Sequence, residues 1–283
     1  MFSLLDRIIL RLTLAIFIIC QLACHDKAGP ENPTHELKLK KDTSSIEVTQ
    51  PFQVSYSKIT VAALDSLPAF AIENILALNR IDRKFLRSHD SLMVPDTLVE
   101  KLIFYAPFPH LVNVPEHIAR LVVVSLRLQA FAAYDSAKLV RWGPVSSGKT
   151  STPTPSGLFY TNWKSKKTIS TENPEWMLNW YFNIENRRGI SIHEYDLPGY
   201  PASHSCIRMR GQDAKWLYGW AKQWRLSGRG AVLENGTPVV IYGFNNFGRK
   251  KQVWRTPALY NSNMLQDQED LQEALQVLKS DEE

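Results

Sequence analysis

The chain has 283 residues, 44% of them hydrophobic, three cysteines and a formal net charge of +5. The charge is uneven, because residues 267–283 hold seven acidic residues and one lysine, a net −6 that leaves +11 on the remainder. A basic body suits an anionic polymer such as the cell wall or lipid headgroups, although a solvated surface is the commoner explanation. Cys20 and Cys24 lie near the N-terminus, so the folded part retains only Cys206 and an internal disulfide is excluded.

Residues 1–23 have the layout of a bacterial secretory signal peptide. Arg7 and Arg11 precede an apolar core at 12–19, and small residues lead to Cys24. This core is shorter than the ~20 apolar residues that a membrane span needs. Ala23-Cys24 favours a lipoprotein signal with Cys24 lipidated, while ordinary cleavage nearby and a retained anchor are the alternatives.

Export is expected in each of these cases. We expect a protein of the periplasm or cell envelope, with a membrane-anchored lipoprotein as the first choice and no nucleic-acid partner. Residues 24–60 then predict a polar tether that runs out from the membrane.

Residues 61–116 predict a small, α-rich N-terminal subdomain. A helical stripe is followed by a turn, a short helix near residues 84–86 and a strand end at Val94-Pro95; the stripe consists of Ile72, Ile75, Leu76 and Leu78. From its "LNRI" and "LMVP" stretches, the segment resembles the latter part of a lysin motif, a small wall-glycan-binding module. A linker subdomain that packs on the main domain is the alternative.

Residues 117–246 predict a mainly β domain, because apolar runs such as "ARLVVVSLRLQAFAAYD" and "GISIH" alternate with turn signals. One helix is expected directly after Cys206, with Asp213 as its N-cap and Gly228 as its stop; its apolar face would consist of Trp216, Leu217, Trp220 and Trp224. Residues 247–283 predict a C-terminal extension with an acidic helix, in which Leu271, Leu275 and Leu278 have helical spacing.

The candidate site lies around Cys206. An exported protein that keeps one free thiol holds either an inert buried cysteine or a reactive one. A reactive thiol attacks as thiolate and needs a nearby base, which an imidazole supplies. His193 ends a predicted strand, while His204 and Arg208 stand two residues before and after Cys206, so in an extended segment these three share one side.

Two other interpretations of these residues stay open on spacing alone. Two histidines and a thiolate are adequate zinc ligands, with Asp196 as the nearest fourth candidate, but structural zinc sites usually use a second cysteine. The other alternative is a buried inert cysteine with surface histidines. We therefore expect no metal and no cofactor.

The stretch "IHEYDLPGYPASHSCIRM" resembles the signature of the L,D-transpeptidases: a histidine, a loop, then Ser/Thr-His-Gly-Cys, an apolar residue and Arg or Asn. The similarity extends from about Ile118 to Gly243 and includes "SSGKTSTPTPSGLF", "WMLNWYFNIENRRGISIH" and "NGTPVVIYG". It implies a β-sandwich-like catalytic domain with a helix inserted after the nucleophile.

The resemblance implies a role for each matching residue. Cys206 would be the acyl-accepting nucleophile and His193 its general base, while His204 and Arg208 would shape the pocket and hold the substrate. Ser205 stands where glycine is usual, which implies a tighter approach of the backbone. The short interval between His193 and Cys206 puts a lid formed by this loop in doubt.

Three aromatic residues, Trp176, Trp180 and Tyr181, are candidates to line the substrate cradle, although core packing is the more common role of such side chains. The implied reaction is peptidoglycan L,D-transpeptidation. Cys206 would form a thioester with the third residue of a tetrapeptide stem, release D-Ala and pass the acyl group to an amine. Water as the acceptor would give an L,D-carboxypeptidase, and an amine of another protein an anchoring enzyme. A catalytically silent wall-binding lipoprotein is the rival from another class.

Overall fold

The computed structural model describes residues 38–40, 54–170, 172–245 and 252–279. The predicted signal peptide, the lipidation of Cys24 and most of the predicted tether lie outside these residues. Among the described residues, no helix is both long and apolar enough to cross a membrane.

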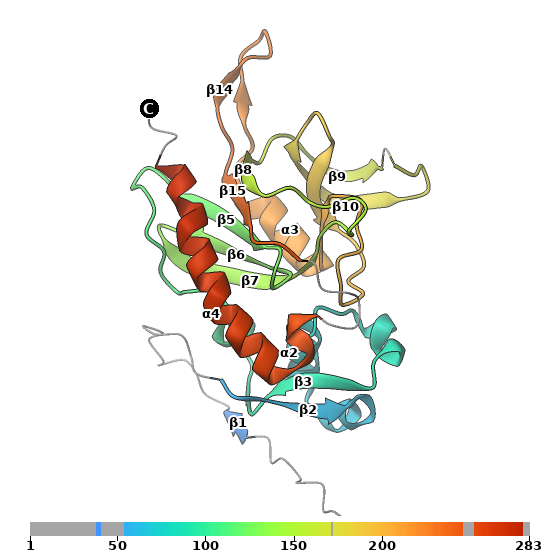
Figure 1. Ribbon diagram of the computed structural model, residues 1–283. Helices are drawn as coiled ribbons and strands as arrows, with labels where there is room; N and C mark the ends of the chain where they lie inside the picture. Colours follow the sequence, from blue (N-terminus) through green and yellow to red (C-terminus); the bar gives the residue numbers. More distant parts are fainter. Residues whose placement is uncertain (1–37, 41–53, 171, 246–251, 280–283) are drawn as a thin grey trace, which may run out of the picture. The chain divides into compact units, whose positions relative to one another are not determined.

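A nine-stranded sheet forms the body of the protein, which confirms the mainly β prediction (Figure 1). Its spatial order is β8 (Gly157–Tyr160), β15 (Pro238–Tyr242), β5 (Arg120–Ser125), β6 (Ala130–Asp135), β7 (Lys138–Ser146), β12 (Ile207–Met209), β11 (Ile190–Glu194), β10 (Met177–Glu185) and β9 (Lys164–Ile169). The pairs β15–β5 and β11–β12 are parallel, and the other neighbours are antiparallel.

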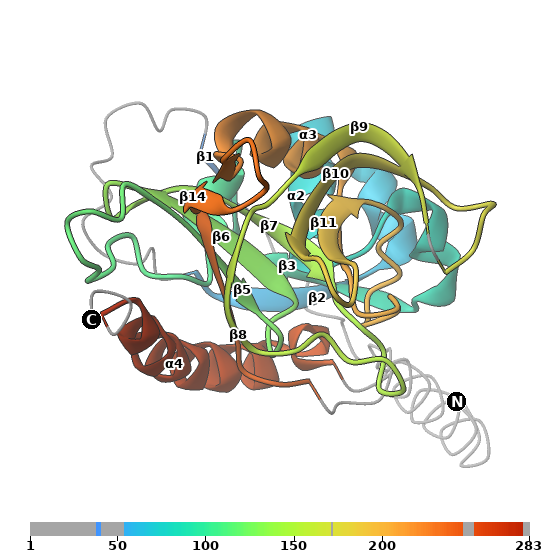
Figure 2. The same ribbon diagram turned by 90° about the horizontal axis from the view of Figure 1, so that it is seen from above.

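The sheet is buried on both faces, since alternate residues of one strand enter different cores. In β5, Leu121 and Val123 belong to a core that includes residues of α4 (Pro257–Ala274), whereas Val122 and Val124 belong to a core that includes residues of α3 (Gly211–Trp220). Seen from above, the two helices therefore lie on opposite sides of the central strands (Figure 2).

The helix after Cys206 is present, but its predicted ends are wrong. It begins at Gly211 with Arg210 as N-cap and ends at Trp220, so Trp224 and Gly228 lie beyond it. Asp213 is fully buried and binds two guanidinium groups instead of capping the helix. One of them belongs to Arg141, which is distant in sequence and could not be foreseen from local spacing.

The N-terminal subdomain is a compact unit made of β2 (Tyr56–Thr60), η1 (Val61–Ser66), α2 (Ala69–Leu78), η2 (Arg83–Ser88) and β3 (Ser91–Pro95). Strands β2 and β3 pair in antiparallel fashion, so residues 56–60 belong to the fold and not to the predicted tether. Two further pairs of short strands lie outside the main sheet: β4 (Thr97–Val99) pairs with β1 (Lys38–Lys40) in parallel, and β13 (Arg225–Leu226) pairs with β14 (Val232–Glu234) in antiparallel fashion. The described chain also contains two short 3-10 helices, η3 (Leu102–Tyr105) and η4 (Val253–Arg255).

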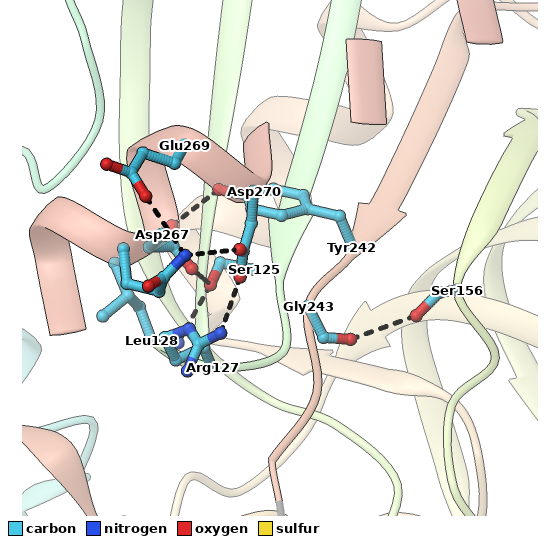
Figure 3. Close-up of polar contacts among 10 residues, drawn as sticks. Ser125, Arg127, Leu128, Ser156, Tyr242, Gly243, Asp267, Glu269 and Asp270 are labelled. Atoms are coloured by element: carbon cyan, nitrogen blue, oxygen red, sulfur yellow. Dashed lines mark hydrogen bonds and ion pairs between the residues drawn. The ribbon is translucent and has the colours of Figure 1, made fainter. Parts of the chain in front are cut away.

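The C-terminal helix is longer than its leucine spacing predicted, and it continues into η5 (Leu275–Leu278). Leu271, Leu275 and Leu278 are buried, as expected. A buried carboxylate also anchors the helix: Asp267 accepts hydrogen bonds from the hydroxyls of Ser125 and Tyr242 (Figure 3).

A second, partly buried pair lies beside this anchor, where the guanidinium of Arg127 donates to Asp270 at 2.6 Å (Figure 3). Burial raises the pKa of Asp267 to about 6, although the two hydroxyl hydrogen bonds oppose the rise. The helix therefore depends on a carboxyl group that titrates near neutral pH.

We expect this carboxyl group to make the protein less stable as the pH rises. Its pKa is higher in the folded state than in the unfolded state, so its contribution is complete below about pH 4 and is lost as the pH passes about 6. For the shift from about 4 to about 6, the change in the free energy of unfolding is roughly 3 kcal/mol. Urea unfolding of the wild type and of Asp267→Asn at pH 4.5 and pH 7 measures this change in the free energy of unfolding. A difference between the two proteins that does not change with pH would contradict the assignment.

Candidate active site

The parallel pair β11–β12 brings the predicted site residues together. His193 on β11 lies in register with Arg208 on β12, and Cys206 directly precedes β12. A narrow cleft is lined by all of the proposed polar residues except Ser205; its lining consists of Ser170, Glu172, Trp176, Leu178, His193, Tyr195, Ser203, His204, Cys206 and Arg208.

The imidazole of His193 is held in one tautomer. Its Nδ1 lies 2.9 Å from the carbonyl oxygen of Glu194. A carbonyl oxygen only accepts hydrogen bonds, so Nδ1 carries the proton and Nε2 is left as the free base. Burial lowers the pKa of His193 to about 4, and the positive charge of Arg208 adds to this effect while the Glu194 hydrogen bond opposes it. At neutral pH the ring is therefore an unprotonated base.

The thiol of Cys206 is also neutral in this state. Burial raises its pKa, while hydrogen bonds from Ser191 and the charge of Arg208 lower it. The hydroxyl of Ser191 donates to Sγ at 3.3 Å, and the thiol donates to the carbonyl oxygen of Gly189 at 3.7 Å. Ser191 was missed in the sequence, although its position two residues before His193 on one strand was a usable signal.

Arg208 lies in the cleft with its guanidinium 4.5 Å from the centre of the Tyr195 ring. Within the described ranges it forms no ion pair with an acidic side chain. Stacking on the ring holds the planar group in place while its N–H donors remain available. The cleft therefore contains a guanidinium that fits a carboxylate.

Ser205 adopts a backbone conformation that suits glycine. Its φ of 77° lies in the left-handed region, where a residue other than glycine costs on the order of 1–2 kcal/mol. The turn that contains it is held from both sides: the Ser205 hydroxyl donates to the Thr152 carbonyl at 3.3 Å, and the Thr154 hydroxyl donates to the Ser205 carbonyl at 2.7 Å. Ser203 donates to the carbonyl oxygen of Cys206. The departure from glycine thus stores strain next to the thiol without removing a hydrogen-bond partner.

His204 lines the same cleft as His193. The amine of Lys149, in the loop between β7 and β8, lies 2.9 Å from its Nε2. The Trp176 ring packs on the imidazole at 5.4 Å. No pattern in the sequence points to Lys149, which lies 55 residues from His204 in the chain.

The three aromatic candidates lie in three different places. Trp176 lines the cleft, whereas Tyr181 is buried behind it and stacks on His193 at 6.4 Å. Trp180 packs against Tyr218 of α3 and does not line this cleft. Its assignment to the substrate stays a prediction. The pairing of β10 with β11 shifts between Asn179 and Phe182, and this bulge breaks the alternation that would put Trp180 on the cleft side.

The loop between His193 and Cys206 is tied to the N-terminal subdomain, and its ends line the cleft through Tyr195, Ser203 and His204. The N–H of Leu197 donates to the carboxylate of Asp82, the N–H of Asp82 donates back to the Leu197 carbonyl, and Ile81 forms a bridge with Pro198. Trp176 and Leu178, on the β9–β10 side, also line the cleft. The space within it is about 30 Å³, enough for one or two water molecules.

Asp196, considered as a fourth zinc ligand, is engaged elsewhere. Its carboxylate pairs with Lys84 at 2.5 Å. Among the residues that the structure describes, no three histidine, cysteine or acidic side chains are grouped to hold a metal ion.

Comparison with known proteins matches residues 119–241 to the family model of the L,D-transpeptidase catalytic domain (YkuD). No curated protein matches the chain. Among solved structures, an L,D-transpeptidase from Stackebrandtia nassauensis is 21% identical, with 45% of this chain and 57% of that chain covered and a TM-score of 0.37. An L,D-transpeptidase from Xylanimonas cellulosilytica is 24% identical, with coverage of 44% and 60% and a TM-score of 0.35. An L,D-transpeptidase from Mycobacterium smegmatis is 20% identical, with coverage of 44% and 59% and a TM-score of 0.36. This chain thus spans less than two thirds of each of them.

We expect Ser191→Ala to make the Cys206 thiol less reactive. The variant loses the hydroxyl that stabilises the thiolate, and a hydrogen bond to a charged group contributes roughly 1.5–3 kcal/mol. Alkylation by iodoacetamide at pH 8 should slow by about tenfold or more, because the rate follows the thiolate fraction. Ser170→Ala removes a hydroxyl of the same cleft that does not contact the sulfur, and it should react like the wild type. Equal slowing in both variants would contradict the role of Ser191.

Proposed function

We propose that this chain, which carries an L,D-transpeptidase catalytic domain at residues 119–241, is a peptidoglycan L,D-transpeptidase with Cys206 as nucleophile and His193 as general base. One observation carries the assignment. The thiol and an imidazole whose Nε2 is free line the same narrow cleft.

In the first half-reaction, Nε2 of His193 takes the thiol proton and Sγ attacks the carbonyl carbon of the third residue in a tetrapeptide stem. Backbone N–H groups of the turn that ends at Cys206 would stabilise the oxyanion. The carbon–nitrogen bond then breaks, His193 returns the proton to the departing amine, and D-Ala leaves. A thioester remains on Cys206.

In the second half-reaction, an amine of a neighbouring stem attacks the thioester carbon. His193 accepts the proton of the amine, the carbon–sulfur bond breaks, and the thiol is restored. The guanidinium of Arg208, free of acidic partners in the described residues, fits a carboxylate of the stem peptide. The same cycle with water gives a carboxypeptidase, so the acceptor is what distinguishes the two activities.

The environment of the cleft favours the neutral forms of both the Cys206 thiol and the His193 imidazole. Burial raises the pKa of Cys206 and lowers that of His193 to about 4, so proton transfer between them is uphill until charge develops on the substrate. Ser191 reduces that cost because it favours the thiolate. Arg208 also favours the thiolate, but its charge disfavours the imidazolium of His193. This arrangement supports a thiol that is activated during the attack and is not a thiolate beforehand.

We further propose that the protein acts in the cell envelope, where peptidoglycan lies. Support comes from the secretory pattern of residues 1–23 and from Cys24, which is placed for lipidation.

We expect Cys206→Ala to abolish all chemistry on purified muropeptides. Wild-type protein should convert tetrapeptide stems into dimers joined between third residues, with release of D-Ala, and mass spectrometry of the products measures both. Shortened tripeptides without dimers would identify a carboxypeptidase. No change with either protein would favour the wall-binding lipoprotein, and absence of a carbapenem adduct on Cys206 would support that outcome independently.

We expect His193→Gln to lower the rate of Cys206 acylation by about 10²–10⁴-fold, because general base catalysis of this kind contributes that much. Stopped-flow measurement with a carbapenem follows the acylation directly. His110→Gln removes a histidine that lies outside the cleft and should leave the rate unchanged. A His193→Gln rate within threefold of the wild type would assign the base to another residue.

A further inference from the structure

The contact between Lys149 and His204 determines which nitrogen of His204 carries a proton. An ammonium group donates hydrogen bonds and accepts none. Nζ of Lys149 lies 2.9 Å from Nε2 of His204, so Nε2 must accept. The imidazole is then neutral and carries its single proton on Nδ1.

This Nδ1–H group has no hydrogen-bond partner among the described residues and no access to solvent. The ring itself lines the cleft together with Cys206, and Trp176 packs across it at 5.4 Å. Buried N–H donors are nearly always paired, and one that lacks a partner at a cleft is a candidate to pair with a ligand. The oxygen of a bound peptide would supply the missing acceptor.

Lys149 is placed by its backbone and is not a freely moving surface lysine. Its N–H donates to the carbonyl oxygen of Ser203 at 3.0 Å, next to His204, and the preceding Gly148 forms a bridge with the same serine. A Cβ at Gly148 would lie 2.1 Å from the Thr152 carbonyl oxygen, so the loop can approach this closely only with glycine there. Backbone contacts therefore hold the segment of Lys149 against the segment of His204.

The two histidines of the cleft thus leave different groups unengaged in the described structure. In His193 the Glu194 carbonyl binds Nδ1–H and leaves Nε2 as a base. In His204 the Lys149 ammonium binds Nε2 and leaves Nδ1–H as a donor. One ring is prepared to take a proton and the other to donate a hydrogen bond.

We propose that Lys149 is a positioning residue that holds His204 as the Nδ1–H tautomer, and that this N–H donates to a carbonyl oxygen of the acyl-donor peptide. The proposal rests on the proposed function for the identity of the donor peptide. It goes beyond that function by assigning a role to a residue outside the cleft and a protonation state to a second imidazole.

The tautomer is tested first, without any substrate, by nitrogen-15 NMR of histidine-labelled protein, with His204→Asn to assign the signal. The wild type should show His204 protonated at Nδ1. Lys149→Met removes the donor and should shift the population toward Nε2–H, whereas Lys149→Arg keeps a donor-only cation and should retain the wild-type signal. A wild type protonated at Nε2, or a Lys149→Met variant that keeps the Nδ1–H signal, would overturn the proposal.

The hydrogen bond to the donor is tested by acylation of Cys206 with a tetrapeptide or a carbapenem. Lys149→Met should acylate about tenfold more slowly or worse, while alkylation of the same thiol by iodoacetamide stays at the wild-type rate because it needs no donor from His204. Lys149→Arg should restore most of the acylation rate. Lys166→Met removes an exposed lysine of β9 as a charge control and should behave as the wild type.

Acylation of Lys149→Met at the wild-type rate would overturn the role toward the substrate. Equal loss of acylation and alkylation would also overturn it, because it would indicate a collapsed cleft and a purely structural lysine. If the wild type itself formed no acyl adduct, the proposed function would fail, and the NMR result would still decide the pairing of Lys149 with His204.

Discussion

A buried guanidinium that has no carboxylate partner among the described residues is the constraint on which the packing of several elements depends. Arg80 is completely buried and has a left-handed φ of 56°. Its cation lies 5–6 Å from the rings of Trp142, Trp254 and Tyr260, which belong to β7, η4 and α4. Its Nε donates to the carbonyl oxygen of Leu128 at 2.9 Å. Removing a cation from water is tolerable only if such a set of rings and carbonyl groups surrounds it, so all of these elements must assemble around one side chain.

The neighbours of Arg80 extend this constraint to the active site. Asn79 ties α2 to β3 through both its amide oxygen and its amide nitrogen. Ile81 and Asp82, on the other side, hold Leu197 and Pro198 in the loop that links His193 to Cys206. The "LNRI" stretch that resembles a lysin motif is thus occupied by contacts with the catalytic domain. These contacts hold the short loop between His193 and Cys206 against the N-terminal segment, whereas glycan binding by that segment stays a prediction.

The parts of the site that could be predicted from the sequence are those encoded within one strand or one loop. Cys206, His204 and Arg208 line one cleft, as their two-residue spacing predicted, although residues 204–206 form a turn and not an extended strand. His193 lies near the end of a strand with clear apolar spacing. Trp180 does not line the cleft, and a bulge in β10 interrupts the alternation there. Local periodicity carries no information about such an insertion, nor about partners that come from another part of the chain.

Long-range partners account for the other differences. Asp213 looked like a helix cap, but Arg141, which is 72 residues away, draws its carboxylate into the core. Lys149 lies in a loop whose composition predicts only a turn, and its meeting with His204 depends on the pairing of that loop with Ser203. The fold class and the proposed nucleophile therefore follow from sequence pattern, whereas tautomers and charge environments follow from contacts that only the tertiary structure creates.

Burial affects the two reacting groups in opposite directions, with one chemical result. It disfavours the thiolate of Cys206 and the imidazolium of His193, so the resting pair is a thiol and a neutral ring. A thiol reacts with oxidants far more slowly than a thiolate, which matters for a free cysteine in the exported setting that we propose. Ser191, whose hydroxyl contacts the sulfur, and Arg208, whose charge lowers the pKa of the thiol, both favour the thiolate. Desolvation therefore keeps the thiol of the cleft neutral. The hydrogen bond and the charge that favour the thiolate lie within the same few residues, and we propose that they act when an acyl donor arrives.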